Sequence, residues 1–194
     1  MLSRSALSRL LLTFLIVVTL PGCGYNRLVA LQEGVDGAWS QVENVYQRRA
    51  DLVPNLVATV KGAAEFEQET LTQVVEARAK VSQINLQGPP DAAGLEAFQN
   101  AQDGLSSALS RLLVVVERYP ELGATQAFRD LQTQLEGTEN RIAVERMRFN
   151  EATTNYNTKR RQFPSNLTAI MFDFEEKPYF AATAGADTPP KVEF

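Results

Sequence analysis

Apolar residues recur at alternating steps of three and four positions along four long segments of this chain. This spacing places the apolar side chains along one stripe of an α-helix, as in helices that pack against one another. The first stripe, within residues 26–50, consists of Leu28, Leu31, Val35, Trp39, Val42 and either Val45 or Tyr46. Because no segment has the period of two that is typical of strands, the sequence predicts an all-α fold.

The second predicted helix, residues 52–86, carries two charged residues on its apolar stripe. The stripe consists of Val57, Val60, Ala64, Glu67, Leu71, Val74, Arg78 and Val81. We therefore expect Glu67 and Arg78 to be at least partly buried and hydrogen-bonded to side chains across the bundle. Such a structural polar seam fixes how helices align, because breaking a buried charged pair is costly. A functional polar site is the alternative interpretation.

Two further long helices follow. Asp91 can cap the third helix, residues 92–119, and Pro120 begins a tight turn after it. The fourth helix, residues 125–162, ends before Pro164, and a short terminal helix follows. The apolar stripe continues through both long helices, so each is predicted to pack in the same core.

The lengths of these helices predict the architecture. Helices of about 27 residues are about 40 Å long at 1.5 Å per residue. Joined by short loops, they predict an antiparallel up-and-down four-helix bundle over residues 23–180, followed by a flexible tail at residues 181–194. An aromatic group near the end of the bundle consists of Phe172, Phe174, Tyr179 and Phe180. This group is predicted to cover the end of the bundle, and contact with a membrane is the alternative.

The N-terminus has the charge and length of a secretory signal. Arg4 and Arg9 precede an apolar run over residues 10–20. This run is shorter than the 20 or so residues that span a bilayer, and it has the length of the apolar part of a signal peptide.

A sequence that resembles a bacterial lipobox follows directly, as Leu20-Pro21-Gly22-Cys23. We therefore predict a lipoprotein signal peptide at residues 1–22 and lipid on Cys23, which would anchor the protein in a membrane. An incidental or buried cysteine after an ordinary signal is the alternative. Gly24, rather than Asp, favours the outer membrane over the inner membrane by resemblance to Gram-negative sorting rules.

The segment at residues 48–61 lies where the first helical pattern ends and the second begins. Asp51 can accept a hydrogen bond from a first-turn amide as an N-cap, and Pro54 would then lie where a missing N–H is tolerated. One continuous helix kinked at Pro54 is the alternative. The capping chemistry favours a break between the two helices.

A break there would place two turns at the membrane-distal end of the bundle, because the chain turns again at residues 119–125. The polar residues near these turns are candidate partner-binding residues: Arg48, Arg49, Asp51, Asn55, Glu117 and Arg118, with Glu121 beside them. Capping and turn stabilisation by these charges is the alternative interpretation.

Composition excludes several classes of function. The net charge is −4, and loss of Arg4 and Arg9 with residues 1–22 would leave −6, which disfavours nucleic-acid binding. The chain has no histidine, so His-based metal sites and Ser-His or Cys-His catalysis are excluded. The single cysteine cannot form an internal disulfide. Without a Gly-rich phosphate loop or a nucleophile elbow, we expect no enzymatic activity, no metal and no cofactor.

Several segments resemble those of a known family. The run Arg-Arg-x-Asp-Leu-Val-Pro-Asn-Leu-Val at residues 48–57, with Val-Lys after it, resembles the signature of the LemA family. Further matches, in order, are Glu76-Ala77-Arg78, Glu117-Arg118-Tyr119-Pro120-Glu121-Leu122, residues 131–135, Glu139-Asn140-Arg141-Ile142-Ala143, Phe149-Asn150-Glu151-Ala152, Tyr156-Asn157 and Phe163-Pro164. The resemblance covers residues 25–180. It implies a membrane-anchored antiparallel helical bundle with no established enzymatic activity and no catalytic residues.

The N-terminus departs from this resemblance, because many relatives look anchored by an uncleaved transmembrane helix. The predicted function is a lipid-anchored scaffold or adaptor of the bacterial cell envelope that faces the periplasm and binds an envelope protein partner. The alternatives are a small-molecule-binding bundle and a hydrolase. An internal void would favour the small-molecule-binding bundle.

Overall fold

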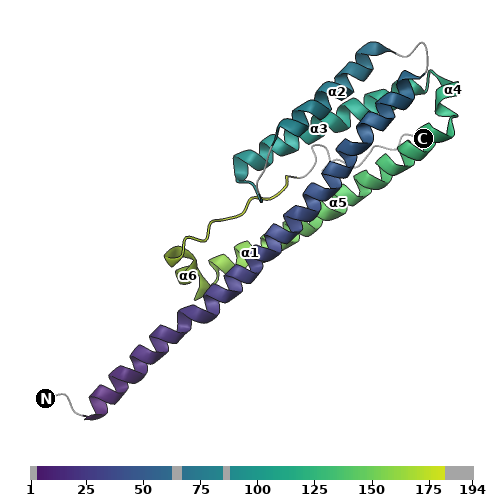
Figure 1. The fold of residues 1–194 in the computed structure, drawn as a ribbon. Coiled ribbons are helices and arrows are strands. Elements are labelled where there is room, and N and C mark those ends of the chain that lie inside the picture. Colours follow the sequence, from purple (N-terminus) through teal and green to yellow (C-terminus); the bar gives the residue numbers. More distant parts are fainter. Residues whose placement is uncertain (1–3, 63–66, 85–87, 182–194) are drawn as a thin grey trace, which may run out of the picture.

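A computed structural model describes residues 4–62, 67–84 and 88–181, and only the backbone of residues 4–23 (Figure 1). The helices within these ranges are α1 (Arg4–Lys61), α2 (Gln68–Gln83), α3 (Ala92–Val116), α4 (Pro120–Gly123), α5 (Gln126–Arg161) and α6 (Ser165–Met171). The same ranges contain no strand, so the predicted all-α fold class is confirmed.

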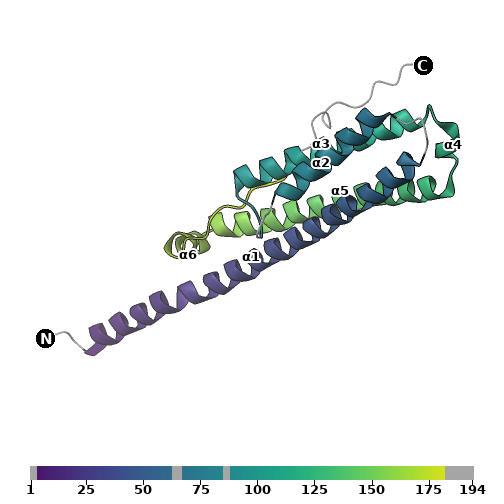
Figure 2. The ribbon, with the colours of Figure 1, turned by 45° about the horizontal axis from the view of Figure 1, so that its top comes forward.

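The long helices form two antiparallel pairs. α1 packs along α5, and α2 packs along α3 (Figures 1 and 2). The α2–α3 pair lies beside the C-terminal half of α1, while α6 lies against α1 nearer to the N-terminus. α4 joins α3 to α5 at the end of the molecule remote from the N-terminus (Figure 1). We call that end distal and the end at α6 proximal.

The predicted helix break at Pro54 is wrong, because α1 runs without interruption to Lys61. Pro54 has no N–H to bond the carbonyl of Ala50, four residues earlier. The Nε of Arg78 in α2 donates a hydrogen bond to this carbonyl instead, at 3.0 Å. The helix continues because a side chain from a neighbouring helix replaces the bond that proline removes.

This continuity changes the second predicted helix. α1 ends at Lys61 and α2 begins at Gln68, so the stripe counted from Val57 does not extend to Glu67. Glu67 precedes α2 with its side chain 42% exposed, so its predicted burial on the seam is wrong. Arg78 is half-buried as predicted, but its partner across the bundle is a backbone carbonyl and not a side chain.

The third, fourth and terminal helices follow their predictions closely. The side chain of Asp91 accepts a hydrogen bond from the Gly94 N–H at 2.7 Å and caps α3. Thr125 caps α5 in the same way, accepting from the Phe128 N–H at 3.3 Å. The short helix α4 was not predicted, and Pro120 occupies its first turn, where a missing N–H is tolerated.

Two clusters of buried apolar side chains form the core. The distal cluster is mainly aliphatic and consists of Leu52, Val53, Leu56, Val57, Val60, Leu71, Val74, Leu105, Ala108, Leu109, Leu112, Val116, Leu122, Phe128 and Leu135. The proximal cluster is rich in rings and consists of Val35, Trp39, Val42, Tyr46, Leu95, Phe98, Ile142, Phe149, Tyr156 and Phe180. The Trp39 ring lies 5.4 Å from Phe98 and 5.6 Å from Phe149, both edge-on, which is a favourable geometry.

An extended segment at residues 174–181, which we call the strap, follows α6 and runs back along α5 (Figure 1). Asn157 donates to the carbonyl of Lys177 at 2.8 Å and accepts from its N–H at 3.0 Å. Asn150 makes the same pair of bonds with Phe180, at 3.2 and 2.9 Å. The two asparagines therefore hold the strap antiparallel to α5.

The spacing of these bonds fits helix and strand geometry. Asn150 and Asn157 are seven residues apart, a rise of about 10.5 Å along a helix. Lys177 and Phe180 are three residues apart, about 10 Å along an extended chain. Each asparagine thus lies opposite one strap residue and satisfies both of its backbone groups.

Candidate functional site

Arg49 lies at the centre of the fold, with its side chain only 1% exposed. Its Nη1 donates to Ser106 Oγ at 2.6 Å and forms an ion pair with Glu139 Oε1 at 2.7 Å. Its Nη2 donates to the backbone carbonyl of Gln102 at 3.1 Å and also to the Gln102 side-chain oxygen. We call Arg49, Gln102, Ser106 and Glu139 the Arg49 centre. It joins α1 to both α3 and α5.

The electrostatics of the Arg49 centre depend on its partners. A buried guanidinium group is stable only where charge and hydrogen bonds compensate for its lost hydration. Glu139 supplies the charge and is itself 45% exposed. The guanidinium carbon also lies 5.1 Å from the centre of the Tyr46 ring, a favourable cation–π distance. Burial raises the pKa of Tyr46, although Arg146 and Arg49 act in the opposite direction.

The residue after Arg49 carries the second tie between helices. The Ala50 carbonyl has no helical donor because residue 54 is proline, and it accepts a hydrogen bond from Arg78 instead. Consecutive residues of α1 are therefore bonded to α3 and α5 through the Arg49 side chain and to α2 through the Ala50 carbonyl. This pair of bonded positions holds all four long helices in one register.

The predicted partner-binding residues lie in three separate places. Arg49 is buried, so its predicted place in an exposed cluster is wrong: in a continuous α1, position 49 faces the core. Arg48, Asp51 and Asn55 lie on the exposed side of α1, three and four residues apart, and Gln47 donates to Asp51 at 2.8 Å. We call Arg48, Asp51 and Asn55 the α1 flank.

Glu117 and Arg118 lie at the distal end, between α3 and α4, where both are exposed. Arg118 forms an ion pair with Glu67 at 2.7 Å, which links the start of α2 to the end of α3. An exposed pair of this kind contributes under about 1 kcal/mol to stability. We call Glu67, Glu117 and Arg118 the distal patch. The predicted proximity of Arg48 and Arg49 to this patch is wrong, because the chain does not turn at residue 50.

Two predictions fall on parts of the chain that the structure does not describe. The predicted lipidation site is the side chain of Cys23, which lies outside the described side chains. The predicted flexible tail lies outside the described residues from 182 to 194. Among the helices that are described, none has the length and hydropathy that a membrane span requires.

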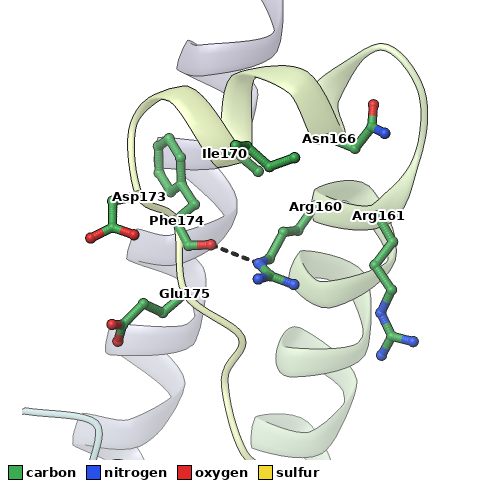
Figure 3. A pocket seen from close by; sticks show the side chains of 8 residues that line it. Arg160, Arg161, Asn166, Ile170, Asp173, Phe174 and Glu175 are labelled. Atoms are coloured by element: carbon green, nitrogen blue, oxygen red, sulfur yellow. Dashed lines mark hydrogen bonds between the residues drawn. The ribbon is translucent and has the colours of Figure 1, made fainter.

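Surface hollows, rather than one deep cleft, mark the described surface. One of about 510 Å³ lies between α5, α6 and the strap, lined in part by Arg160, Ile170 and Phe174 (Figure 3). The Nε of Arg160 donates to the Phe174 carbonyl at 2.6 Å across it. Within the described ranges, no three acidic or cysteine side chains converge as metal ligands do.

The sequence contained signals for residues that were not singled out. Gln102 falls on the apolar stripe of the third helix, seven residues after Leu95 and three before Leu105, and a polar residue there requires a buried partner. Asn150 and Asn157 repeat at a spacing of seven on the inner side of the fourth helix, which is unusual for side chains with two donors and an acceptor. The positions of Ser106 and Glu139 had no comparable signal.

An all-α chain of long helices has the fold class that the sequence motifs implied. The family model described as LemA family matches residues 38–194, so the chain belongs to the LemA family. It is 28% identical over 183 residues to Magnetosome protein MamQ 2 of Paramagnetospirillum magneticum, covering 85% of this chain and 67% of that protein. Magnetosome protein MamQ of Magnetospirillum gryphiswaldense is 27% identical over 183 residues, again covering 85% of this chain and 67% of that protein. Protein LemA of Metamycoplasma hominis is 25% identical over 158 residues, covering 81% of this chain and 69% of that protein.

Proposed function

We propose that this protein is a membrane-anchored, non-enzymatic scaffold of the bacterial cell envelope that presents its distal end and α1 flank to a partner protein. The observation that carries the proposal is the continuity of α1. One helix leads from Cys23, where the proposed anchor lies, to the distal end, and Pro54 does not interrupt it. Membership of the LemA family and similarity to proteins named for the magnetosome support a scaffold role.

The anchor in this proposal is lipid on Cys23, after removal of residues 1–22. From Cys23 to Lys61, α1 rises about 57 Å at 1.5 Å per residue. A protein anchored in this way would face the periplasm, with the outer membrane favoured. The distal patch would then stand well clear of the lipid surface.

Rigid display is what the interior of the protein contributes. In the proposal, the two antiparallel pairs act as one up-and-down four-helix bundle, held in register by the Arg49 centre and by Arg78. A partner surface on a rigid frame loses little conformational entropy on binding, so a few charged contacts suffice for specificity. The α1 flank and the distal patch carry both signs of charge, which suits a protein partner better than nucleic acid.

Cross-linking in living cells tests this proposal. A photoreactive residue is placed singly at Asn55 of the α1 flank and Glu117 of the distal patch, and at the exposed control positions Arg27 and Arg141. We expect adducts of one size from positions 55 and 117, and their loss when Arg48→Glu and Arg118→Glu are added to each probe variant. Adducts from Arg27 or Arg141 alone would contradict the distal site.

A matched variant controls for nonspecific effects of charge. Lys80→Glu with Arg141→Glu reverses two exposed charges that belong to neither the α1 flank nor the distal patch, and it should leave the adducts intact. Intact mass of membrane-extracted protein tests the anchor separately. Residues 23–194 with a triacyl-type adduct are expected, and an unmodified Cys23 would contradict the lipid anchor.

A further inference from the structure

The polarity of α6 is inverted relative to an ordinary surface helix. Its buried residues include Ser165 and Thr168, while Leu167, Ile170 and Met171 are 56%, 80% and 69% exposed. Ile170 comes three positions after Leu167, and Met171 comes one position later, so all three side chains lie on one side of the helix. Phe163 and Phe172, at 79% and 51% exposed, flank them. We call Phe163, Leu167, Ile170, Met171 and Phe172 the α6 apolar face.

The core does not need this face. Phe180, which is 4% exposed, packs against Trp39 and Phe149 in the interior, and the Phe174 ring lies 5.7 Å from Tyr25. The other two members of the aromatic group, Phe172 and Tyr179, are exposed. A cluster of large exposed apolar side chains on a folded domain marks an interaction site.

The fold holds α6 directly beside the start of the anchored segment. A Cβ on Gly24 would lie 3.0 Å from Thr168 Oγ1, so the backbone of α1 comes close to the side chain of Thr168 in α6. The Tyr25 ring lies 4.8 Å from Phe172. Gly24 follows Cys23, the proposed lipid site, on the same helix. A membrane that holds lipid on Cys23 is therefore the surface nearest to α6.

The charges around α6 favour an apolar contact over an electrostatic one. Arg160 and Arg161 both pair with Glu176, at 3.5 and 3.0 Å. Asp173 and Glu175 lie at the same hollow (Figure 3). Because two basic and three acidic groups lie here, attraction to anionic lipid headgroups contributes little, and burial of apolar side chains supplies the affinity.

We propose that the α6 apolar face inserts into the boundary between headgroups and acyl chains of the bilayer. This inference rests on the proposed membrane anchoring. Two contacts, the N-terminal anchor and α6, then fix the tilt of the bundle on the membrane, where one flexible attachment would leave it free to rotate. The distal patch is held at a constant height as a result.

Quenching by brominated lipid tests the insertion. Full-length Ile170→Trp protein is reconstituted in phosphatidylcholine vesicles with and without brominated acyl chains. Val114→Trp is the matched control, because Val114 is also exposed, at 64%, but lies on α3. The buried native Trp39 supplies the background, measured in unsubstituted protein. We expect the tryptophan added at position 170 to be quenched at least threefold more than the tryptophan added at position 114.

Equal quenching at the two positions would overturn the proposal. A signal from position 170 that changes with protein concentration and not with brominated lipid would also overturn it, because a second copy would then cover this face. Quenching that requires anionic lipid is a third contrary result, since basic side chains would then be responsible. Met171→Trp repeats the test at a second position of the face.

The α6 contact and the proposed function can fail independently of each other. Lipidated Cys23 with no quenching at position 170 contradicts only the α6 contact. Unmodified Cys23 with strong quenching contradicts only the lipid anchor, because α6 then contacts the bilayer without it. Distal cross-linking depends on neither of these results.

Discussion

The distal and proximal halves of the molecule solve the same packing problem in different ways. In the distal half, α1, α2, α3, α4 and α5 all contribute to a core that consists mainly of leucine and valine side chains. In the proximal half, α2 has ended at Gln83, and the strap supplies the Phe180 ring to an aromatic core. An extended segment of the chain therefore takes the place of a helix.

The difference shows what an extended segment needs in order to replace a helix. A helix satisfies its own backbone groups, whereas a buried extended segment needs partners for each N–H and carbonyl. Asn150 and Asn157 supply those partners with two bonds each. The distal half therefore depends on close packing, and the proximal half also depends on specific hydrogen bonds from side chains to the backbone.

Arg49 lies between the two halves, and its loss should have the largest effect. Arg49→Ala removes four hydrogen bonds and leaves Gln102 without its charged partner. We expect a loss of about 3 kcal/mol in the free energy of unfolding, at the low end for buried pairs because Glu139 is partly solvated. Urea denaturation measures it, and the exposed neighbour variant Arg48→Ala should change stability by under about 0.5 kcal/mol. A comparably small loss for Arg49→Ala would contradict its central role.

Leu105→Ala tests the dependence of the distal half on packing. Leu105 is fully buried in the aliphatic cluster, so truncation leaves a cavity and should cost about 2.5 kcal/mol or more. Val114→Ala, on the exposed side of the same helix, is the control and should have little effect. Hydrogen exchange should show faster opening of α2 and α3 with the strap amides unchanged. Loss of protection in the strap as well would show that the two halves do not respond separately.

Asn157→Ala tests the dependence of the proximal half on side-chain bonds. It leaves both backbone groups of Lys177 without these partners and should cost about 2 kcal/mol. Amide exchange of residues 174–181 should accelerate while α2 and α3 keep their protection. Asn155→Ala, exposed on the same helix, should leave exchange in the strap unaltered. Full protection of the strap in Asn157→Ala would contradict the role of the two asparagines.

Asp36 gives the smallest expected effect and a pH dependence. Burial raises the pKa of Asp36 above its ordinary value of 3.8, an effect that Lys177 of the strap opposes and Glu33 adds to. A raised pKa means that the folded state favours the protonated form, so this contribution to stability is present at low pH and lost as pH rises through the folded-state value. Because Asp36 is only partly buried and solvent screens its charge, Asp36→Asn should be more stable than the natural chain at pH 7 by under about 0.5 kcal/mol. Chemical denaturation at pH 7 and pH 3 measures it; an advantage that grows towards pH 3 would contradict the assignment.

Periodicity predicted much of the fold because most of the core lies on regular helices. The seams of α3 and α5, the cap at Asp91 and the start of α5 near Thr125 follow from local sequence. The strap could not be predicted from local sequence, because a short extended segment has no long apolar period. Its hydrogen-bond partners on α5 also lie about 20 to 30 residues away in the sequence.

The wrong predictions at Pro54 and Arg49 have a common cause. The neighbours of these two residues in sequence predict a helix break and an exposed charge. The groups that decide both outcomes are distant: Arg78 bonds the carbonyl that Pro54 frees, and Gln102 and Glu139 enclose Arg49. Local sequence identifies the missing N–H and the charge, but only the tertiary structure identifies what compensates for them.

The continuity of α1 through Pro54 is the central claim, and a double-mutant cycle between Pro54→Ala and Arg78→Ala tests it most directly. In the natural chain, Arg78→Ala leaves the Ala50 carbonyl without its donor and should cost about 1–3 kcal/mol. In the Pro54→Ala background, the alanine N–H can bond that carbonyl, so the same substitution should cost at least about 1 kcal/mol less. Equal costs in the two backgrounds would show that Arg78 does not compensate for the proline, and would contradict this account of how α1 remains one helix.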